Sequence, residues 1–260
     1  MSNFLALMEQ SAGGALARQL ALGDYLGAHE WEVNTQTGRV NFGKKRVHPI
    51  QILGTENQSD GTWTWAWANT ASGLPEPVVE LSTRLRDHGG EHKIPELSKG
   101  RFRMEHLDGH AIALACSGLV GRLPYYRGPF DGGALFFYVL ATPASVGAPV
   151  NVARASQVIQ QLIAGFELHH ERAVAAFLVG EGLYVEANEA GPLAAGGRDA
   201  RGLRWPGARD AHPRAAVAAA AGQATLVEAQ GLTHHRRAVC HPRVVPGPSL
   251  PSCPSCWRWP

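Results

Sequence analysis

The sequence predicts an α+β fold in which an antiparallel sheet, a meander plus a hairpin, is packed with an N-terminal helix, a middle helix and a long C-terminal helix. Two observations indicate the sheet: residues 31–68 contain apolar side chains at period two, and residues 125–140 read as a further hairpin. A third indicates the helices, because residues 4–28, 77–87 and 151–179 place apolar side chains at helical spacing.

Composition places the chain among globular proteins, with 45% hydrophobic and 18% charged residues. A length of 260 residues suits one large domain or two small ones. The net charge of +2 is no nucleic-acid signature, and the absence of an apolar run of about 18 residues predicts no membrane span. The first ten residues lack the pattern of a secretory signal, so we expect a cytoplasmic protein.

The first predicted element is the helix over residues 4–28. Gly13 and Gly14 lower the helix propensity of its first half, and Gly27 is a plausible stop. From Trp31 the period changes to two, which predicts strands over 31–34 and 38–42 across a polar turn.

A third strand is predicted over 47–53 and a fourth over 62–68. Short loops join these strands, including the turn-forming segment 56–61, so we expect an antiparallel meander. The fourth strand carries Trp63, Trp65 and Trp67, which alternation places on one face. Each indole can bury roughly 150–250 Å², so this strand should organise the core.

Gly89-Gly90 is expected to end the middle helix, and residues 102–106 read as a short strand. Residues 108–120 admit two interpretations. Asp108-Gly109 could form a hairpin turn, but apolar side chains at 112, 116 and 119 favour a helix that Asp108 caps.

The second hairpin joins residues 125–130 to 134–140. Its second arm is apolar on both faces, so it should be a central strand. Asn151 can cap the long helix over 151–179, and a short strand at 183–186 closes the predicted domain, whose bounds we set at 1–188.

Residues 189–260 form an Ala/Gly/Pro/Arg-rich tail without periodic pattern. Residues 191–260 hold nine Arg, no Lys and nine of the 17 Pro, and their net charge is +6 against −4 for the rest. Two interpretations stay open: a native disordered appendage, or translation out of frame through GC-rich DNA.

Several segments together resemble an uncharacterised bacterial family of domain-of-unknown-function proteins. They are Gln51-Ile-Leu-Gly-Thr55, Gly61-Thr-Trp-Thr-Trp-Ala-Trp-Ala-Asn69, residues 84–89, Tyr125-Tyr-Arg-Gly-Pro129 and Gly133-Ala-Leu-Phe-Phe137. The resemblance covers roughly residues 5–185. It implies a small intracellular α+β domain and implies no activity.

The first functional hypothesis is a non-catalytic binding or interaction module for a small ligand or a protein partner, with no nucleic acid and no membrane as partner. Its aromatic and arginine content motivates the hypothesis. Arg127 would hold a carboxylate or phosphate. The candidate ligand-binding residues are Trp63, Trp65, Trp67, Asn69, Gln51, Tyr125, Tyr126 and Arg127. The other reading of the same residues is core packing.

Two alternatives come from other classes. One is an enzyme with a non-local acid–base site built from Glu105, His106, Asp108 and His110. The other is a structural protein that dimerises through the long helix. No nucleophile elbow, phosphate-binding glycine loop or dinucleotide fingerprint is present, which lowers the expectation of an enzyme.

We expect no cofactor and no metal site. Glu167 and His170 have the i, i+3 spacing of carboxylate-bridged metal sites but lack a second such pair. Cys253-Pro-Ser-Cys256 is half of a zinc-ribbon pattern, and Cys240 could add to it, but the spacing matches no standard finger. Whether these three cysteines bind a metal stays open.

Overall fold

The computed structural model of the chain describes residues 3–43, 46–186 and 194–196. Within them, six α-helices accompany a seven-stranded antiparallel sheet, so the predicted α+β class is confirmed. In chain order the elements are α1 (Asn3–Leu26), β1 (Trp31–Asn34), β2 (Arg39–Phe42), β3 (Arg46–Asn57), β4 (Thr62–Trp65), the 3-10 turns η1 (Ala66–Ala68) and η2 (Thr70–Ser72), α2 (Glu76–Glu91), α3 (Pro95–Ser98), β5 (Arg101–Arg103), α4 (Gly109–Leu119), β6 (Tyr125–Phe130), β7 (Gly133–Val139), α5 (Val152–Gly165), α6 (His170–Gly180), β8 (Tyr184–Glu186) and β9 (Ala194–Gly196).

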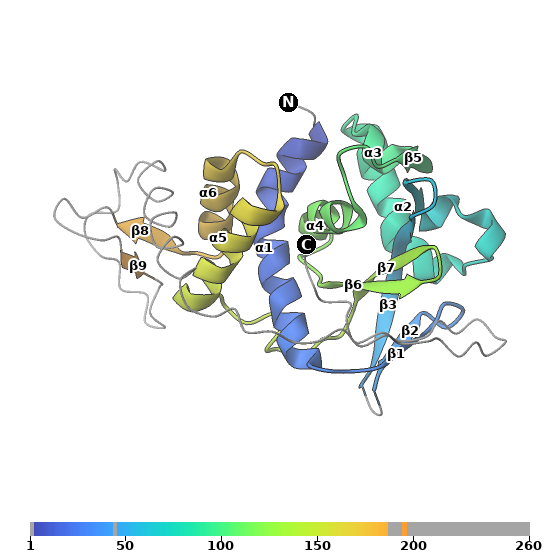
Figure 1. The fold of residues 1–260 in the computed structure, drawn as a ribbon, viewed down its shortest axis with the longest axis horizontal. Helices are drawn as coiled ribbons and strands as arrows, with labels where there is room; N and C mark the ends of the chain where they lie inside the picture. Colours follow the sequence, from blue (N-terminus) through green and yellow to red (C-terminus); the bar gives the residue numbers. More distant parts are fainter. Residues whose placement is uncertain (1–2, 44–45, 187–193, 197–260) are drawn as a thin grey trace.

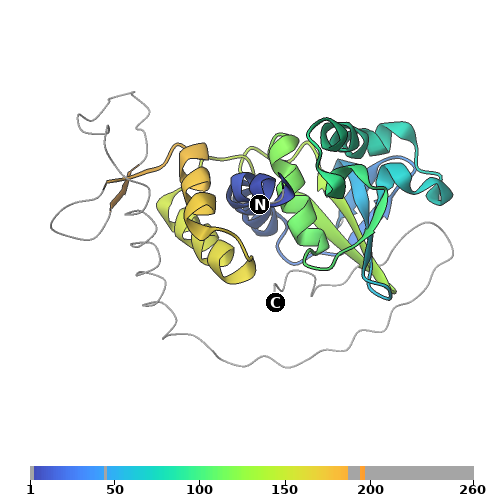
Figure 2. The ribbon, with the colours of Figure 1, turned by 90° about the horizontal axis from the view of Figure 1, so that it is seen from above.

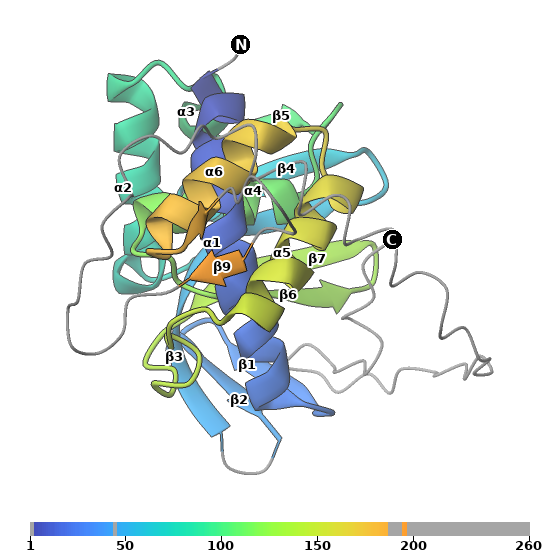
Figure 3. The same ribbon diagram turned by 90° about the vertical axis from the view of Figure 1, so that its left-hand side faces the viewer.

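The helices and the sheet form layers (Figure 1). Helices α1 and α4 lie between the sheet on one side and the α5–α6 pair on the other, as the view from above also shows (Figure 2). Seen from the side of α5 and α6, these two helices cover α1 (Figure 3). The middle position of α1 explains why residues on several of its sides are buried, among them Phe4, Leu16 and Leu22.

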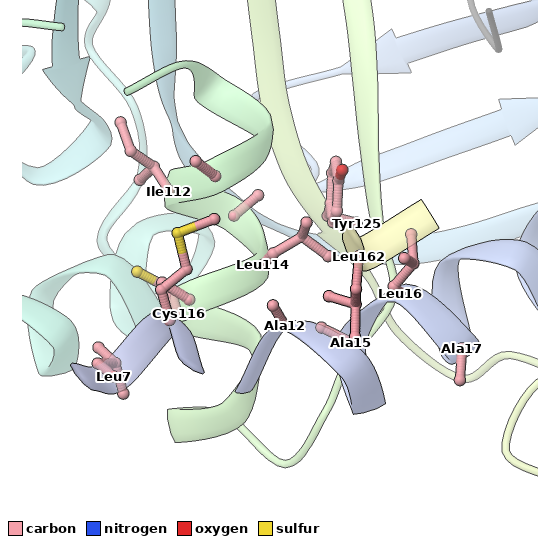
Figure 4. Close-up of a cluster of buried hydrophobic side chains, with 14 of the residues drawn as sticks. Leu7, Ala12, Ala15, Leu16, Ala17, Ile112, Leu114, Cys116, Tyr125 and Leu162 are labelled. Atoms are coloured by element: carbon pink, nitrogen blue, oxygen red, sulfur yellow. The ribbon is translucent and has the colours of Figure 1, made fainter. Parts of the chain in front are cut away.

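The two glycines of α1 permit close packing of its neighbours. A Cβ at Gly13 would lie 2.5 Å from Cβ of Phe177 on α6, and one at Gly14 would lie 3.3 Å from Nε of Arg122. Gly13 therefore lets α6 contact α1 directly, and Gly14 leaves room for the Arg122 side chain. On the side of α1 that faces α4, the small side chains Ala12 and Ala15 lie near Leu114 (Figure 4).

The sheet is organised around β3, which pairs with β2 over its first residues, with β4 over its last, and with β7 over most of its length. The expected meander β1-β2-β3-β4 is present and antiparallel, and β7 lies between β3 and β6 as the apolar pattern predicted. A register shift between Ile52 and Gly54 marks a β-bulge, which bends the long strand. Strand β3 ends at Asn57, four residues beyond the predicted end, because its last four residues pair with both β4 and β7.

The middle helix does not end at Gly89-Gly90. Helix α2 continues to Glu91, and Gly89 is buried where α3 packs on it. A Cβ at Gly89 would lie 2.5 Å from Cβ of Leu97, whereas a Cβ at Gly90 would meet nothing within 4 Å. The first glycine thus serves close helix packing rather than termination.

The predicted long helix over 151–179 is two helices, so this prediction is wrong in its middle. Helix α5 ends at Gly165, and α6 begins at His170. The break is fixed by α1, because the buried Glu9 carboxylate accepts a hydrogen bond from the His169 N–H at 3.2 Å. The apolar stripe runs through the break in phase and gives no sign of it.

Both predicted helix caps are confirmed. Asp108 Oδ1 accepts from the Ala111 N–H at 2.7 Å, and Asn151 Oδ1 accepts from the Arg154 N–H at 2.8 Å. The helical interpretation of residues 108–120 therefore holds.

The strand predicted at 183–186 is β8, which pairs with β9 in a separate two-stranded sheet and does not join the main one. The boundary at 188 and most of the predicted tail, including its three cysteines, fall outside the described residues. Among the helices of the described residues, none combines the length and apolar character needed to cross a bilayer.

Candidate functional site

The indoles of Trp63 and Trp65 are fully buried in the core beneath the helices. Their rings meet edge to face at 5.5 Å, and Trp63 packs in the same way on Phe136 at 5.4 Å. Gly54 makes room for Trp63, because a Cβ at position 54 would lie 2.6 Å from the indole and 2.6 Å from the Thr64 carbonyl oxygen. Trp65 Nε1 donates to the Glu96 carbonyl oxygen at 2.9 Å. These contacts are those of core side chains.

Trp67 does not lie on the strand. Strand β4 ends at Trp65, and Trp67 sits in the 3-10 turn η1, half-buried, with the Arg86 guanidinium 5.6 Å above its ring. The alternation that predicted three indoles on one face therefore holds for two of them. Asn69, also half-buried, ends this turn through its backbone N–H, which donates to the Ala66 carbonyl oxygen.

Gln51 links the sheet to α2. Its Nε2 donates to the Pro77 carbonyl oxygen at 2.7 Å, and its Oε1 accepts from the Leu81 N–H at 3.0 Å. Because both ends of the side-chain amide are engaged, Gln51 holds α2 against β3.

Tyr125 and Tyr126 follow each other on β6 and point to opposite faces of the sheet, where each is buried in a different core cluster. The Tyr126 hydroxyl lies 3.2 Å from His29 Nε2, and the Tyr125 hydroxyl lies 2.7 Å from His110 Nδ1. Two residues along from Tyr125, Arg127 stands on the same face, with its guanidinium 6.0 Å from the centre of the Phe136 ring.

The structure brings Tyr125 and Arg127 together with groups from two other elements, at the point where the end of β3 meets the start of α4. We call these five side chains the acid–base cluster: Glu56, Asp108, His110, Tyr125 and Arg127. Glu56 and Arg127 form an ion pair, with Glu56 Oε1 3.8 Å from Arg127 Nη2. The Glu56 carboxylate also accepts a hydrogen bond from the Gly109 N–H at the first turn of α4.

Gly109 permits this approach. A Cβ at position 109 would overlap the Phe136 ring and lie 2.9 Å from Glu56 Oε2. The N-terminus of α4 can therefore reach the carboxylate directly, and the helix dipole favours negative charge there.

The cluster shifts its titratable groups in opposite senses. Burial raises the pKa of Glu56, and the nearby Asp108 raises it further, while Arg127 and the Gly109 N–H oppose this rise. Burial lowers the pKa of His110 to about 4, Arg127 adds to the fall and Asp108 opposes it. Groups with perturbed pKa values that converge on one place are typical of binding and catalytic sites.

The protonation states at neutral pH follow from these shifts. His110 is neutral, and Tyr125, whose pKa burial raises well above 10, keeps its proton. A fully buried phenol needs an acceptor, so we assign Tyr125 O–H as the donor to His110 Nδ1, which leaves the proton of the imidazole on Nε2.

Of the four expected acid–base residues, two belong to this cluster and two do not. Asp108 and His110 lie at the start of α4, as described. Glu105 and His106 are exposed on the segment before the helix, and neither shifts the pKa of Glu56 or His110. Sequence reasoning missed Glu56, because residues 56–61 have the composition of a turn, whereas β3 continues through Glu56 to Asn57.

No three potential metal ligands among His, Cys, Asp and Glu come together within the described part of the chain. Cys116 is buried in α4, and burial raises the pKa of its thiol, so it packs as a small apolar side chain.

A buried ion cluster of another kind joins α6 to the rest. The Glu181 carboxylate, which is 3% exposed, pairs with Arg18 at 3.1 Å and with Arg122 at 2.8 Å. Arg18 also donates to the Ala148 carbonyl oxygen, and Arg122 to that of Gly180. Since two guanidinium groups compensate the buried carboxylate, this cluster fixes the end of α6 against α1 and the segment after α4.

Comparison with known proteins gives one match. No curated protein and no solved structure matches the chain. A family model, described as a family of unknown function, matches residues 5–143, which span α1 to β7 and include the whole acid–base cluster. The chain therefore belongs to the family of unknown function DUF6882.

Proposed function

We propose that this protein binds a small molecule at the acid–base cluster without transforming it, and that it does so in the cytoplasm. Of the residues expected to bind a ligand, the proposal keeps Arg127 as the ligand contact, and Tyr125 as a buried residue whose hydroxyl orients His110. Trp63, Trp65 and Gln51 are engaged by contacts within the fold.

The observation that carries the proposal is the convergence of an acid with a raised pKa, Glu56, and a base with a lowered pKa, His110, at a place where part of the cluster reaches solvent. Arg127 and Glu56 are 20% and 15% exposed, and Asp108 is exposed. Arg127 and Glu56 form an ion pair in which Nη2 and Oε1 lie 3.8 Å apart. A guanidinium has five N–H donors, so this pair leaves donors of Arg127 for a ligand.

The charges of the cluster define the ligand. Arg127 presents a fixed cation with planar donors, which suits a carboxylate or a phosphate. Glu56 and Asp108 present acceptors close by, and these repel a purely anionic molecule. The matching ligand carries an anionic group at one end and an ammonium or hydroxyl donor at the other, as amino acids and hydroxy acids do.

The test is an NMR titration of the full chain with a panel of amino acids, hydroxy acids and simple carboxylates. We expect shifts in the backbone amide signals of residues 108–110 and 127 for compounds of the matching class, and weaker shifts for simple carboxylates. Arg127→Gln should abolish the response, because amide donors cannot replace the charge of the guanidinium.

Arg103→Gln is the matched control, since Arg103 is an exposed arginine on β5. Melting temperatures of both variants establish that they fold. Absence of any response across the panel, or an unchanged response in folded Arg127→Gln, would refute the proposal.

An acid–base enzyme at the same cluster is the second candidate, and the raised pKa of Glu56 favours it, because a carboxyl that holds its proton nearer neutrality can serve as a general acid. The same titration distinguishes the two candidates. Signals of a bound compound that convert with time into those of a product, and that stay unconverted with Glu56→Gln, would establish catalysis.

A further inference from the structure

One edge of the main sheet is open to a further strand. Strand β5 is the last strand on the path from β1 to β5, and within the described residues it pairs with β4 alone. The Trp65 N–H donates to the Gly100 carbonyl oxygen at 2.9 Å, which makes position 100 a hydrogen-bonded position of this ladder. Because such positions alternate in antiparallel pairs, the backbone N–H and C=O groups of Arg101 and Arg103 point away from β4.

These four outward backbone groups have no partner in the part of the chain that the structure describes. The Met104 N–H, by contrast, donates to the Gly61 carbonyl oxygen at 2.9 Å, as the alternation requires. Arg101 and Arg103 are about 7 Å apart along the strand. Unpaired donors and acceptors at this repeat are the template that an extended peptide uses when it adds to a sheet.

The side chains at the same two positions give this edge a positive charge. Arg101 and Arg103 are exposed and lie on one face of the strand, and Lys99 adds an exposed cation two residues earlier. Arg101 pairs with the Asp60 carboxylate, whereas Arg103 and Lys99 form no ion pair among the described residues. An added strand therefore meets two cations whose charge no described ion pair compensates.

The position between the two arginines has the opposite character. Phe102 is half-buried and packs against the core cluster that contains Trp63, on the other face of the strand from the arginines. A residue that an added strand placed beside Phe102 would extend this apolar surface. The edge therefore favours a strand in which acidic and apolar side chains alternate, because directly opposite side chains share a face.

We propose that β5 binds an extended acidic segment of another protein as an additional antiparallel strand. Two acidic residues of the segment lie opposite Arg101 and Arg103 and exchange backbone hydrogen bonds with them, and the apolar residue between them lies beside Phe102. The same arginines repel β5 of a second copy, so the edge is closed to pairing with itself. A single amino acid cannot form this pairing, so the surface is separate from the proposed ligand site.

The test uses the peptide acetyl-Glu-Val-Glu-Val-Glu-amide, which is titrated into the full chain to millimolar concentration because two paired positions give weak binding. Backbone amide hydrogen exchange, measured by NMR, reports on each N–H separately. The N–H groups of Arg101 and Arg103 should exchange rapidly in the free protein. Their exchange should slow about tenfold when the peptide concentration reaches about ten times its Kd.

Two modified peptides separate strand pairing from charge attraction. N-methylation of the glutamates removes the donors that face β5 and should abolish the protection, whereas N-methylation of the valines, whose N–H groups face solvent, should leave it intact. Arg101→Gln should weaken binding by up to about fivefold, the factor that one cross-strand charge pair contributes. Arg39→Gln is the matched control, because Arg39 is an exposed arginine on β2, which has a partner strand on each side.

Three results would overturn the proposal. The first is the absence of protection at Arg101 and Arg103 at the highest peptide concentration. The second is protection that survives methylation of the glutamates or is equal for a peptide with glutamine in their place. The third is a sedimentation mass that rises with protein concentration in the absence of peptide, which would identify a second copy of the chain as the occupant.

Discussion

The two adjacent glycines at the end of α2 offer a direct test of how α3 packs. Replacing either by alanine raises helix propensity by about 0.5–1 kcal/mol, because the backbone of the unfolded chain loses freedom. Gly90→Ala places its methyl group in open space, so this gain should appear in full. Gly89→Ala places its methyl group 2.5 Å from Cβ of Leu97 and 3.1 Å from the Ile94 carbonyl oxygen.

Overpacking of this kind costs about 1–3 kcal/mol, and neither contacting atom is the far end of a flexible side chain. Since the propensity gain is common to both variants, the difference between their free energies of unfolding isolates the contact. We expect Gly89→Ala to be less stable than Gly90→Ala by about 1–3 kcal/mol, with wild type between them.

The assay is urea unfolding followed by circular dichroism, with wild type and both variants measured together and the slopes compared to exclude changes in the unfolded state. If Gly89-Gly90 were a loop that terminates the helix, as the sequence alone suggests, the two substitutions would have similar effects. Equal stability of the two variants would therefore refute the close packing of α2 on α3.

Three further predictions concern single side chains. The pKa of His110 is lowered in the folded state, so the stability that its neutral ring contributes is present above pH 6.5 and is lost as the pH falls through about 4. The difference in free energy of unfolding between wild type and His110→Asn should therefore shrink by up to about 3 kcal/mol across this window. Urea unfolding at each pH measures this difference. Asp108→Ala should lower stability by about 0.5–2 kcal/mol through loss of the cap on Ala111, while Asp108→Ser, which restores a capping oxygen, should recover most of this loss in thermal unfolding. Glu181→Ala should lower the free energy of unfolding by about 3 kcal/mol, the lower end of the range for a broken buried ion pair, because Arg122 is partly exposed. A melting temperature equal to that of wild type would contradict the anchoring of α6.

Much of the fold follows from local signals. The cap at Asp108, the cap at Asn151 and the hairpin of β6 and β7 depend on residues a few positions apart, and each was predicted. The errors share another cause. The end of α2 depends on Leu97 of another helix, and the break between α5 and α6 depends on Glu9 of α1. Contacts over such sequence separations leave no periodic trace near the residues they affect.

The candidate site shows the same division. Arg127, Asp108 and His110 could be named from their chemistry, but their meeting with Glu56 depends on the register of β3 on β7 and on the space that Gly109 leaves at the start of α4. Burial then raises the pKa of Glu56 and lowers that of His110, and these shifts are the reason that the cluster is a candidate site.

By itself, the sequence determined the class of the fold, the order of its strands along the chain and the caps of two helices, because side-chain periodicity and short-range hydrogen bonding act within a few residues. Only the tertiary structure decided that Trp63 and Trp65 are core and that Trp67 leaves the strand, and that a glutamate at a strand end lies against a helix start. These outcomes depend on which surfaces the sheet and helices cover, and desolvation on covering is a property of the whole packed chain.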